Sequence, residues 1–191
     1  MRPIDLGPGE AVLHEGDPER CVVLLPGVRY FSQAPLLWFA REVAEAAGWS
    51  VLEVSERAPA DQEPFEWILE RAESALNHTS ATQVALVGKS LGSAAAPLAT
   101  QRALPAVWLT PLLIRAEVLA ALGATDRPTL IIGSPADPSW GNGALPENEA
   151  LEVLELDDLD HSLQREGDPL GSIDVLRTVN ERVASFFERL G

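Results

Sequence analysis

Five residues near the middle of the chain have the types and spacing that nucleophilic catalysis by a serine requires. Residues 88–92 read Gly-Lys-Ser-Leu-Gly, which matches the pattern G-x-S-x-G around Ser90. An apolar run at residues 84–87 precedes the pattern and an alanine-rich segment follows it. This is the strand–turn–helix context in which glycines allow a tight, strained turn to expose the serine. The pattern therefore predicts a serine nucleophile at the carboxyl end of a sheet, with the Leu91 N–H placed to stabilise an oxyanion.

A serine hydroxyl needs a base that takes its proton, and the base needs a third group that orients it. Of the three histidines, only His161 follows the last expected strand, from which it can reach back to Ser90. Asp137 comes directly after an expected strand at residues 129–132, and the order Ser90, Asp137, His161 is one in which such triads occur. Other carboxylates stay open as alternative acids or as solvated loop charges: Asp126, Asp157, Asp158 and Asp160.

Strands and helices alternate around these residues. Apolar runs that end at Gly or Pro indicate buried strands, and apolar residues at helical spacing indicate helices. The expected strands are residues 21–25, 51–54, 84–87, 106–109, 129–132 and 151–156, with a further edge strand at 11–14. The expected helices are residues 35–47, 61–76 with Asp61 as N-cap, 116–122, 172–190 and a helix after Ser90 that Pro97 shortens or bends. This alternation predicts a three-layer α/β/α sandwich with an open, mostly parallel sheet of six or seven strands, in a single domain over residues 1–191.

Taken together, these motifs resemble the α/β-hydrolase fold superfamily over nearly the whole chain. The sequence is similar in detail to short, lid-poor predicted hydrolases. The shared motifs are the Gly-Lys-Ser-Leu-Gly turn, Leu-Thr-Pro-Leu-Leu at residues 109–113, Gly-x-x-Ala-Asp-Pro at 133–138 and Asp-His-Ser-Leu at 160–163. The resemblance implies the α/β-hydrolase fold without a cap domain, and it indicates the chemistry better than the substrate.

The same resemblance implies a role for each candidate residue. Ser90 is the nucleophile, His161 the base and Asp137 the acid. The oxyanion hole is formed by the Leu91 N–H and by an N–H in the loop after the second expected strand, assigned to Val28. That loop reads Pro-Gly-Val-Arg-Tyr, without the His-Gly pair common in esterases, so the second donor stays open.

Other residues near the expected site allow more than one interpretation. Arg29 and Tyr30 either line the pocket and bind a substrate carboxylate or carbonyl, or pack over the sheet edge. Trp140 is the tryptophan expected near the pocket, and the other four are interpreted as core or rim packing. Lys89 is the only lysine and adjoins Ser90, which raises the possibility of a Ser-Lys dyad. Adjacent residues on an extended turn point in different directions, so an exposed or ion-paired lysine is expected instead.

Composition limits the class of protein and its partners. The chain has 191 residues, 46% of them hydrophobic, and a formal net charge of -15, which is typical of an acidic globular domain. This charge argues against binding to nucleic acid or to an anionic membrane. Cys21 is the only cysteine, expected to be buried, and no Cys/His cluster indicates a metal site. We expect a cytoplasmic protein without a cofactor; the sequence does not predict the oligomeric state.

These observations favour a serine hydrolase that cleaves a small ester, thioester or related acyl bond through an acyl-enzyme. The alternatives are a non-hydrolytic scaffold or binding partner of the same fold, or a lyase or cyclase that uses the same pocket. Only residues 110–128 join two strands between which many α/β-hydrolases carry a lid. Because the crossover itself needs about 10–12 residues, one short helix fills this segment. We therefore expect short, neutral or mildly polar acyl substrates.

Overall fold

The computed structural model describes residues 1–7, 9–141 and 145–191. The described residues form an eight-stranded sheet in the order β1-β2-β4-β3-β5-β6-β7-β8. Its strands are β1 (Arg2–Asp5), β2 (Glu10–His14), β3 (Asp17–Leu25), β4 (Trp49–Val54), β5 (Gln83–Lys89), β6 (Ala106–Leu109), β7 (Thr129–Gly133) and β8 (Leu151–Glu155). Strands β3 to β8 pair in parallel, and β1 and β2 add an antiparallel edge. The expected open, mostly parallel sheet is confirmed.

The strand count exceeds the expected six or seven because β1 was missed. Only Ile4 of its four residues is buried, so this edge strand has neither an apolar run nor a clear alternation. The expected edge strand at residues 11–14 is present as β2, which pairs antiparallel with β1 on one side and β4 on the other.

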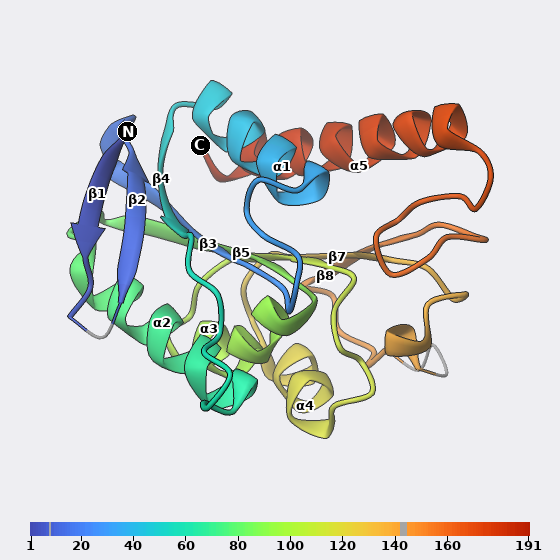
Figure 1. Ribbon diagram of the computed structural model, residues 1–191, viewed down its shortest axis with the longest axis horizontal. Coiled ribbons are helices and arrows are strands. Elements are labelled where there is room, and N and C mark those ends of the chain that lie inside the picture. The colour runs from blue at the N-terminus through green and yellow to red at the C-terminus, as the bar shows by residue number, and fades with distance from the viewer. Residues whose placement is uncertain (8, 142–144) are drawn as a thin grey trace.

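Helices cover both faces of the sheet (Figure 1). Helices α1 (Pro35–Ala46) and α5 (Pro169–Leu190) lie on one face, and α2 (Pro64–His78), α3 (Ala96–Gln101) and α4 (Ala116–Ala124) lie on the other. Glu63, not Asp61, is the N-cap of α2, because Pro64 favours the first helical position and the Glu63 carboxylate accepts a hydrogen bond from the Phe65 N–H. Pro97 likewise lies at the start of α3, after a 3-10 turn at Ser90–Ala95, so this helix is short as expected.

The parallel strands are buried on both faces. Val22 and Leu24 of β3 pack in the cluster that includes residues of α1 and α5, whereas Val23 and Leu25 pack in the cluster on the other face. This is why these strands are continuous apolar runs rather than alternating patterns. Between β6 and β7, the described chain adds only α4 and its connections, so the lid position carries no separate domain.

Glu53 is a buried carboxylate near the end of β4 that connects three other elements. Its Oε2 lies 3.0 Å from His14 Nε2 and 3.2 Å from Arg41 Nη1. Its Oε1 accepts hydrogen bonds from the Ser32 hydroxyl and the Gln33 amide. Strand β2, helix α1 and the loop between β3 and α1 therefore meet at one carboxylate whose side chain is 3% exposed.

We expect Glu53→Ala to lower the free energy of unfolding by about 3–5 kcal/mol, because it leaves the charge of Arg41 buried without this partner. Urea denaturation measures the change. Glu42→Ala is the matched control: Glu42 pairs with the same arginine, but its side chain is 44% exposed. Loss of this surface pair is expected to cost about 1 kcal/mol or less. Equal effects of the two substitutions would contradict a structural role for the buried carboxylate.

None of the helices in the described ranges has both the length and the apolar character needed to cross a bilayer.

Candidate functional site

The turn after β5 holds Ser90 in a conformation that residues with a side chain rarely adopt. Its φ is 52°, in the left-handed region. The flanking glycines are required by close approaches of the backbone. A Cβ at Gly88 would lie 2.7 Å from the Trp108 ring and 2.8 Å from the backbone of Gly92. A Cβ at Gly92 would lie 2.8 Å from the Leu25 carbonyl oxygen. The G-x-S-x-G pattern is thus a steric requirement of this strand-to-helix turn.

The structure brings together the three side chains that the sequence analysis selected. Ser90 Oγ lies 2.8 Å from His161 Nε2, and His161 Nδ1 lies 2.6 Å from Asp137 Oδ2. With Asp137 ionised, Nδ1–H donates to the carboxylate and Nε2 is free to accept the serine proton. The three residues come from the ends of β5, β7 and β8, so the sheet itself determines their relative positions.

Asp137 is the partner of His161 and is held in place from a second side. It caps the 3-10 turn Pro138–Trp140, and its Oδ1 accepts a 2.9 Å hydrogen bond from the Ser139 N–H. Burial by itself would raise the pKa of this carboxyl, but the hydrogen bonds from His161 and Ser139 outweigh that effect and lower the pKa. Asp137 is therefore a carboxylate at neutral pH, as a partner that orients the imidazole must be.

The alternative acids do not hydrogen-bond to His161. Asp160 Oδ1 accepts the N–H groups of Ser162 and Gln164, which shapes the loop that carries the histidine. Asp126 lies beside Arg127 on the surface. The remaining pair, Asp157 and Asp158, is exposed to solvent.

Two buried serines that the sequence analysis did not single out hold the surrounding loops. Ser134 Oγ accepts N–H groups of Ala136 and Leu159, which joins the Asp137 loop to the His161 loop. Ser93 Oγ donates to the Ser90 carbonyl and accepts the Leu112 N–H. Serine is common in loops and turns, so neither position carried a sequence signal that set it apart.

The loop between β3 and α1 lies against Lys89 and Ser90 through Gly27. Gly27 N–H donates to the Tyr30 carbonyl and Tyr30 N–H donates to the Gly27 carbonyl, which closes a tight turn over residues 27–30. Pro26 has no N–H, and among the described residues neither the Val28 N–H nor the Arg29 N–H has an acceptor in a turn or loop. Val28 itself is 53% exposed. Leu91 follows Ser90 in the 3-10 turn.

The structure separates the remaining site candidates. Arg29 is exposed at a positive φ in the turn, whereas the Tyr30 hydroxyl accepts the Leu36 N–H at the start of α1, so Tyr30 packs over the sheet edge.

Trp140 does not line an open pocket: it is 1% exposed, and its ring occupies the space where Gly133 has no side chain. Lys89 was expected to be exposed or ion-paired, and this expectation is wrong. It is 2% exposed, and the ion pairs of the described residues do not include it.

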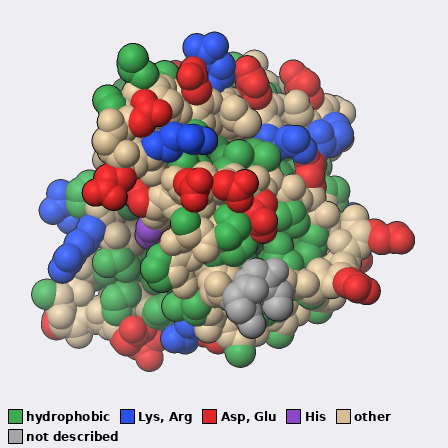
Figure 2. Space-filling model, turned by 90° about the vertical axis from the view of Figure 1, so that its right-hand side faces the viewer, with side chains coloured by type: hydrophobic (Ala, Val, Ile, Leu, Met, Phe, Trp, Pro, Cys, Tyr) green, Lys and Arg blue, Asp and Glu red, His purple; other side chains and the backbone are tan. Residues whose placement is uncertain are grey.

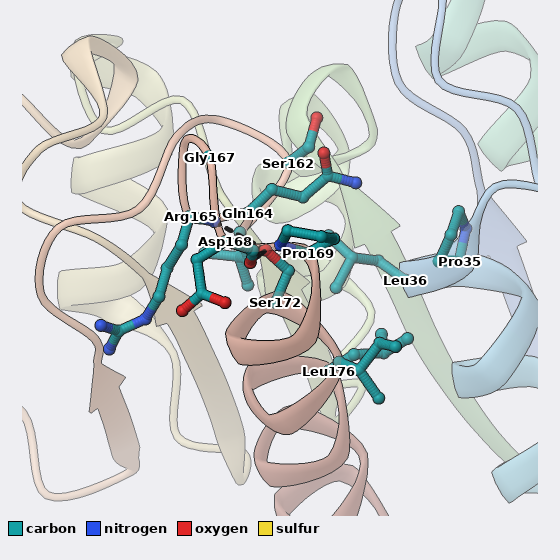
Figure 3. A pocket seen from close by; sticks show the side chains of 12 residues that line it. Pro35, Leu36, Ser162, Gln164, Arg165, Gly167, Asp168, Pro169, Ser172 and Leu176 are labelled. Carbon is teal, nitrogen blue, oxygen red and sulfur yellow. Dashed lines mark hydrogen bonds between the residues drawn. The ribbon is translucent and has the colours of Figure 1, made fainter.

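A cavity of about 320 Å³ adjoins the loop that carries His161 (Figure 3). Leu36 and Leu176 line it from α1 and α5, and Ser162, Gln164 and Arg165 line it from the loop. Its volume is at the lower end of the range for small-molecule sites. Neither Ser90 nor His161 lines the cavity. The cavity is therefore next to the hydrogen-bonded Ser90, His161 and Asp137 side chains but does not include them.

The surroundings of the loop between β8 and α5 are acidic. This loop lies at the right of Figure 1, and Figure 2 views that side, where Asp and Glu side chains cross the middle of the face. Asp157, Asp158 and Asp160 of this loop are all exposed. They do not form a metal site: within the described ranges, no three His, Cys, Asp or Glu side chains are grouped to hold an ion.

No protein-family model matches the chain, and a search of curated protein sequences finds no significant match. Solved structures do match. Est1E from Butyrivibrio proteoclasticus superposes with a TM-score of 0.74 at 15% identity, covering 98% of this chain and 97% of that one. An α/β serine hydrolase homologue from Coxiella burnetii has a TM-score of 0.71 at 12% identity, covering 96% and 95%. A lid-less α/β serine hydrolase from Xanthomonas campestris has a TM-score of 0.68 at 12% identity, covering 95% and 88%.

These likenesses extend over nearly the full length of the compared chains. The protein therefore has the α/β-hydrolase fold without a cap, and the expected fold is confirmed. At 10–16% identity, the likeness is one of fold, and function has to be argued from the residues of this chain.

Proposed function

We propose that the protein is a serine hydrolase that cleaves a small ester, thioester or related acyl bond through an acyl-enzyme. The observation that carries the proposal is a pair of hydrogen bonds through His161. Its Nε2 lies 2.8 Å from Ser90 Oγ, and its Nδ1 lies 2.6 Å from Asp137 Oδ2. Nucleophile, base and orienting carboxylate are within hydrogen-bond reach, which is the geometry that activation of a serine needs. The strained turn at Ser90 supports the same assignment, because such strain is concentrated at functional sites.

In this mechanism Ser90 Oγ attacks the acyl carbonyl while His161 Nε2 takes its proton. The same nitrogen then donates that proton to the departing alcohol or thiol, which leaves an acyl-enzyme. Asp137 holds the imidazole in the required tautomer and stabilises its positive charge. The N–H groups of Leu91 and Val28 stabilise the oxyanion. Water, activated by His161, releases the acid and restores Ser90.

Labelling with a fluorophosphonate probe tests this function, because the probe forms a covalent bond only with an activated serine. We expect one label, which mass spectrometry of peptides places on Ser90. Ser90→Ala should not label, whereas Ser162→Ala, a serine beside His161 with no role in the mechanism, should label at the normal rate. Absence of label on the folded protein would instead support a non-hydrolytic scaffold. Product analysis on an ester substrate then separates hydrolysis from lyase or cyclase chemistry.

We expect kcat/KM to be highest for short acyl chains. Residues between β6 and β7 form only α4 and its connections, and among the residues that the structure describes no lid encloses an acyl chain above Ser90. A chain left in water gains little of the ~25 cal/mol per Å² that burial provides. The exposed carboxylates of the His161 loop also disfavour anionic substrates. A series of p-nitrophenyl esters from acetyl to dodecanoyl measures this preference.

A steady rise in kcat/KM toward dodecanoyl esters would contradict this prediction and would indicate that the apolar cavity beside the His161 loop holds the acyl chain. A jump in rate above the critical micelle concentration of the substrate would contradict it as well, because a site without a lid has no closed state that an interface could open.

A further inference from the structure

Lys89 is a buried cation that the proposed mechanism does not use. It is the only lysine of the chain, it directly precedes Ser90, and it is 2% exposed. Instead of an ion pair, its Nζ lies over the ring of Tyr30, 4.6 Å from the centroid. An ammonium within about 6 Å of an aromatic face is attracted by the ring, and more strongly where water is excluded.

The stem of the same side chain lies against the turn at residues 27–30. A Cβ at Gly27 would lie 3.2 Å from Lys89 Cδ and 3.3 Å from Ser90 Cβ, so Gly27 rests directly on both residues. Tyr30, at the other end of the turn, is held by the ammonium on its ring and by the Leu36 N–H on its hydroxyl. Lys89 therefore contacts both ends of the short turn that presents the Val28 N–H.

We propose that Lys89 is a positioning residue for the oxyanion hole: through Gly27 and the Tyr30 ring, it fixes the turn that carries the Val28 N–H relative to Ser90. This inference rests on the proposed function. Lys89 itself does not touch the substrate or transfer a proton. Its contribution is to hold one of the two oxyanion donors at the distance at which a preorganised donor is effective.

The charge of Lys89 changes within an accessible pH range. Burial lowers its pKa to about 8, against the opposing effect of the carboxylates of Asp137 and Asp160. Burial raises the pKa of Tyr30, so the phenol stays neutral where the lysine loses its proton. A neutral amine has no cation–π attraction to the ring. The rate is therefore expected to fall as pH rises through about 8.

Unfolding does not account for such a fall. The pKa of Lys89 in the folded protein is below the ~10.4 of an exposed lysine, so the unfolded chain binds more protons between these two values. In that window, this group makes the free energy of unfolding rise with pH. Loss of activity together with unchanged or greater stability is the combination that the proposal requires.

The test is the pH profile of kcat/KM for p-nitrophenyl acetate from pH 6 to 10, corrected for the rate of Ser90→Ala. Lys89→Met keeps a stem of similar length without the charge. We expect it to lower kcat/KM about 10-fold at pH 7, less than the ~10²–10³ lost when an oxyanion donor is removed outright. We also expect the decline near pH 8 to disappear, since no charge remains to be lost.

Tyrosine variants separate positioning from a general effect of the substitution. Tyr30→Leu removes the ring, and its profile should lose the decline near pH 8 even though Lys89 is present. Tyr30→Phe keeps the ring and should keep the decline. The double variant of Lys89→Met and Tyr30→Leu should be no slower than the slower single variant, because both changes remove the same contact. If Lys89→Met does not fold, the two tyrosine profiles still decide the question.

Each outcome is distinct from a failure of the proposed function. A wild-type protein that neither labels at Ser90 nor hydrolyses esters would remove the serine hydrolase assignment itself. A wild-type enzyme that is active, with a Lys89→Met variant of equal rate or with the same decline near pH 8, would overturn only the positioning role.

Discussion

Replacement of Ser90 by alanine is expected to lower kcat on a short p-nitrophenyl ester about 10⁶-fold, the loss that removal of the serine causes in a comparable triad. In the proposed mechanism, the Ser90 hydroxyl is the group that forms the covalent intermediate. The fold should be unaffected, because alanine keeps the Cβ and removes only Oγ, whose hydrogen-bond partner is His161. Thermal unfolding of the variant should therefore match the wild type. A variant that retains most of the rate would exclude covalent catalysis at Ser90.

Ser90→Gly is the informative control for this experiment. Glycine adopts a φ of 52° without strain, whereas alanine is strained there as serine is. Both variants should be equally inactive, but the glycine variant should unfold at a higher temperature than the alanine variant. That difference would show that the turn stores strain in order to expose the nucleophile, at the cost of stability.

The parallel part of the fold was predictable because burial on two faces leaves a strong pattern in the sequence. Strand β3 ends in five consecutive apolar residues and β7 has three before Gly133, and each strand is followed by a loop that carries Gly or Pro. The antiparallel edge was not predictable in full, because β1 buries one side chain. The start of α2 was misplaced for a local reason: Asp61 and Glu63 are both suitable caps, and only the position of Pro64 distinguishes them.

The candidate site was predictable to the extent that it depends on chain order. Ser90, Asp137 and His161 each follow a strand of the same parallel sheet, so the topology alone brings them to one edge. The burial of the Trp140 and Lys89 side chains depends instead on contacts with glycines. The Trp140 ring fills the space above Gly133, and the Lys89 stem lies beneath Gly27, which is distant in sequence. A sequence pattern shows that a glycine is present but not which side chain takes the space.

Replacement of Asp137 by asparagine is expected to lower kcat about 10⁴-fold, and the structure shows why. The Ser139 N–H donates to Oδ1, so in the variant the amide oxygen is retained at that position. The amide nitrogen then faces His161 Nδ1 and donates to it. This forces the imidazole into the tautomer whose proton is on Nε2, directed at Ser90. In that tautomer, Nε2 cannot accept the serine proton. The variant therefore keeps the fold, but His161 no longer acts as a general base.

Asp160→Asn is the matched control, because an amide oxygen can still accept the N–H groups of Ser162 and Gln164 that the carboxylate accepts. Its kcat should stay within about 10-fold of the wild type. If instead Asp137→Asn were nearly as active as the wild type, the acid would have to be another carboxylate of the His161 loop. Because the pKa of Asp137 is lowered, the proposed acid stays ionised down to pH values below those at which exposed carboxyls titrate.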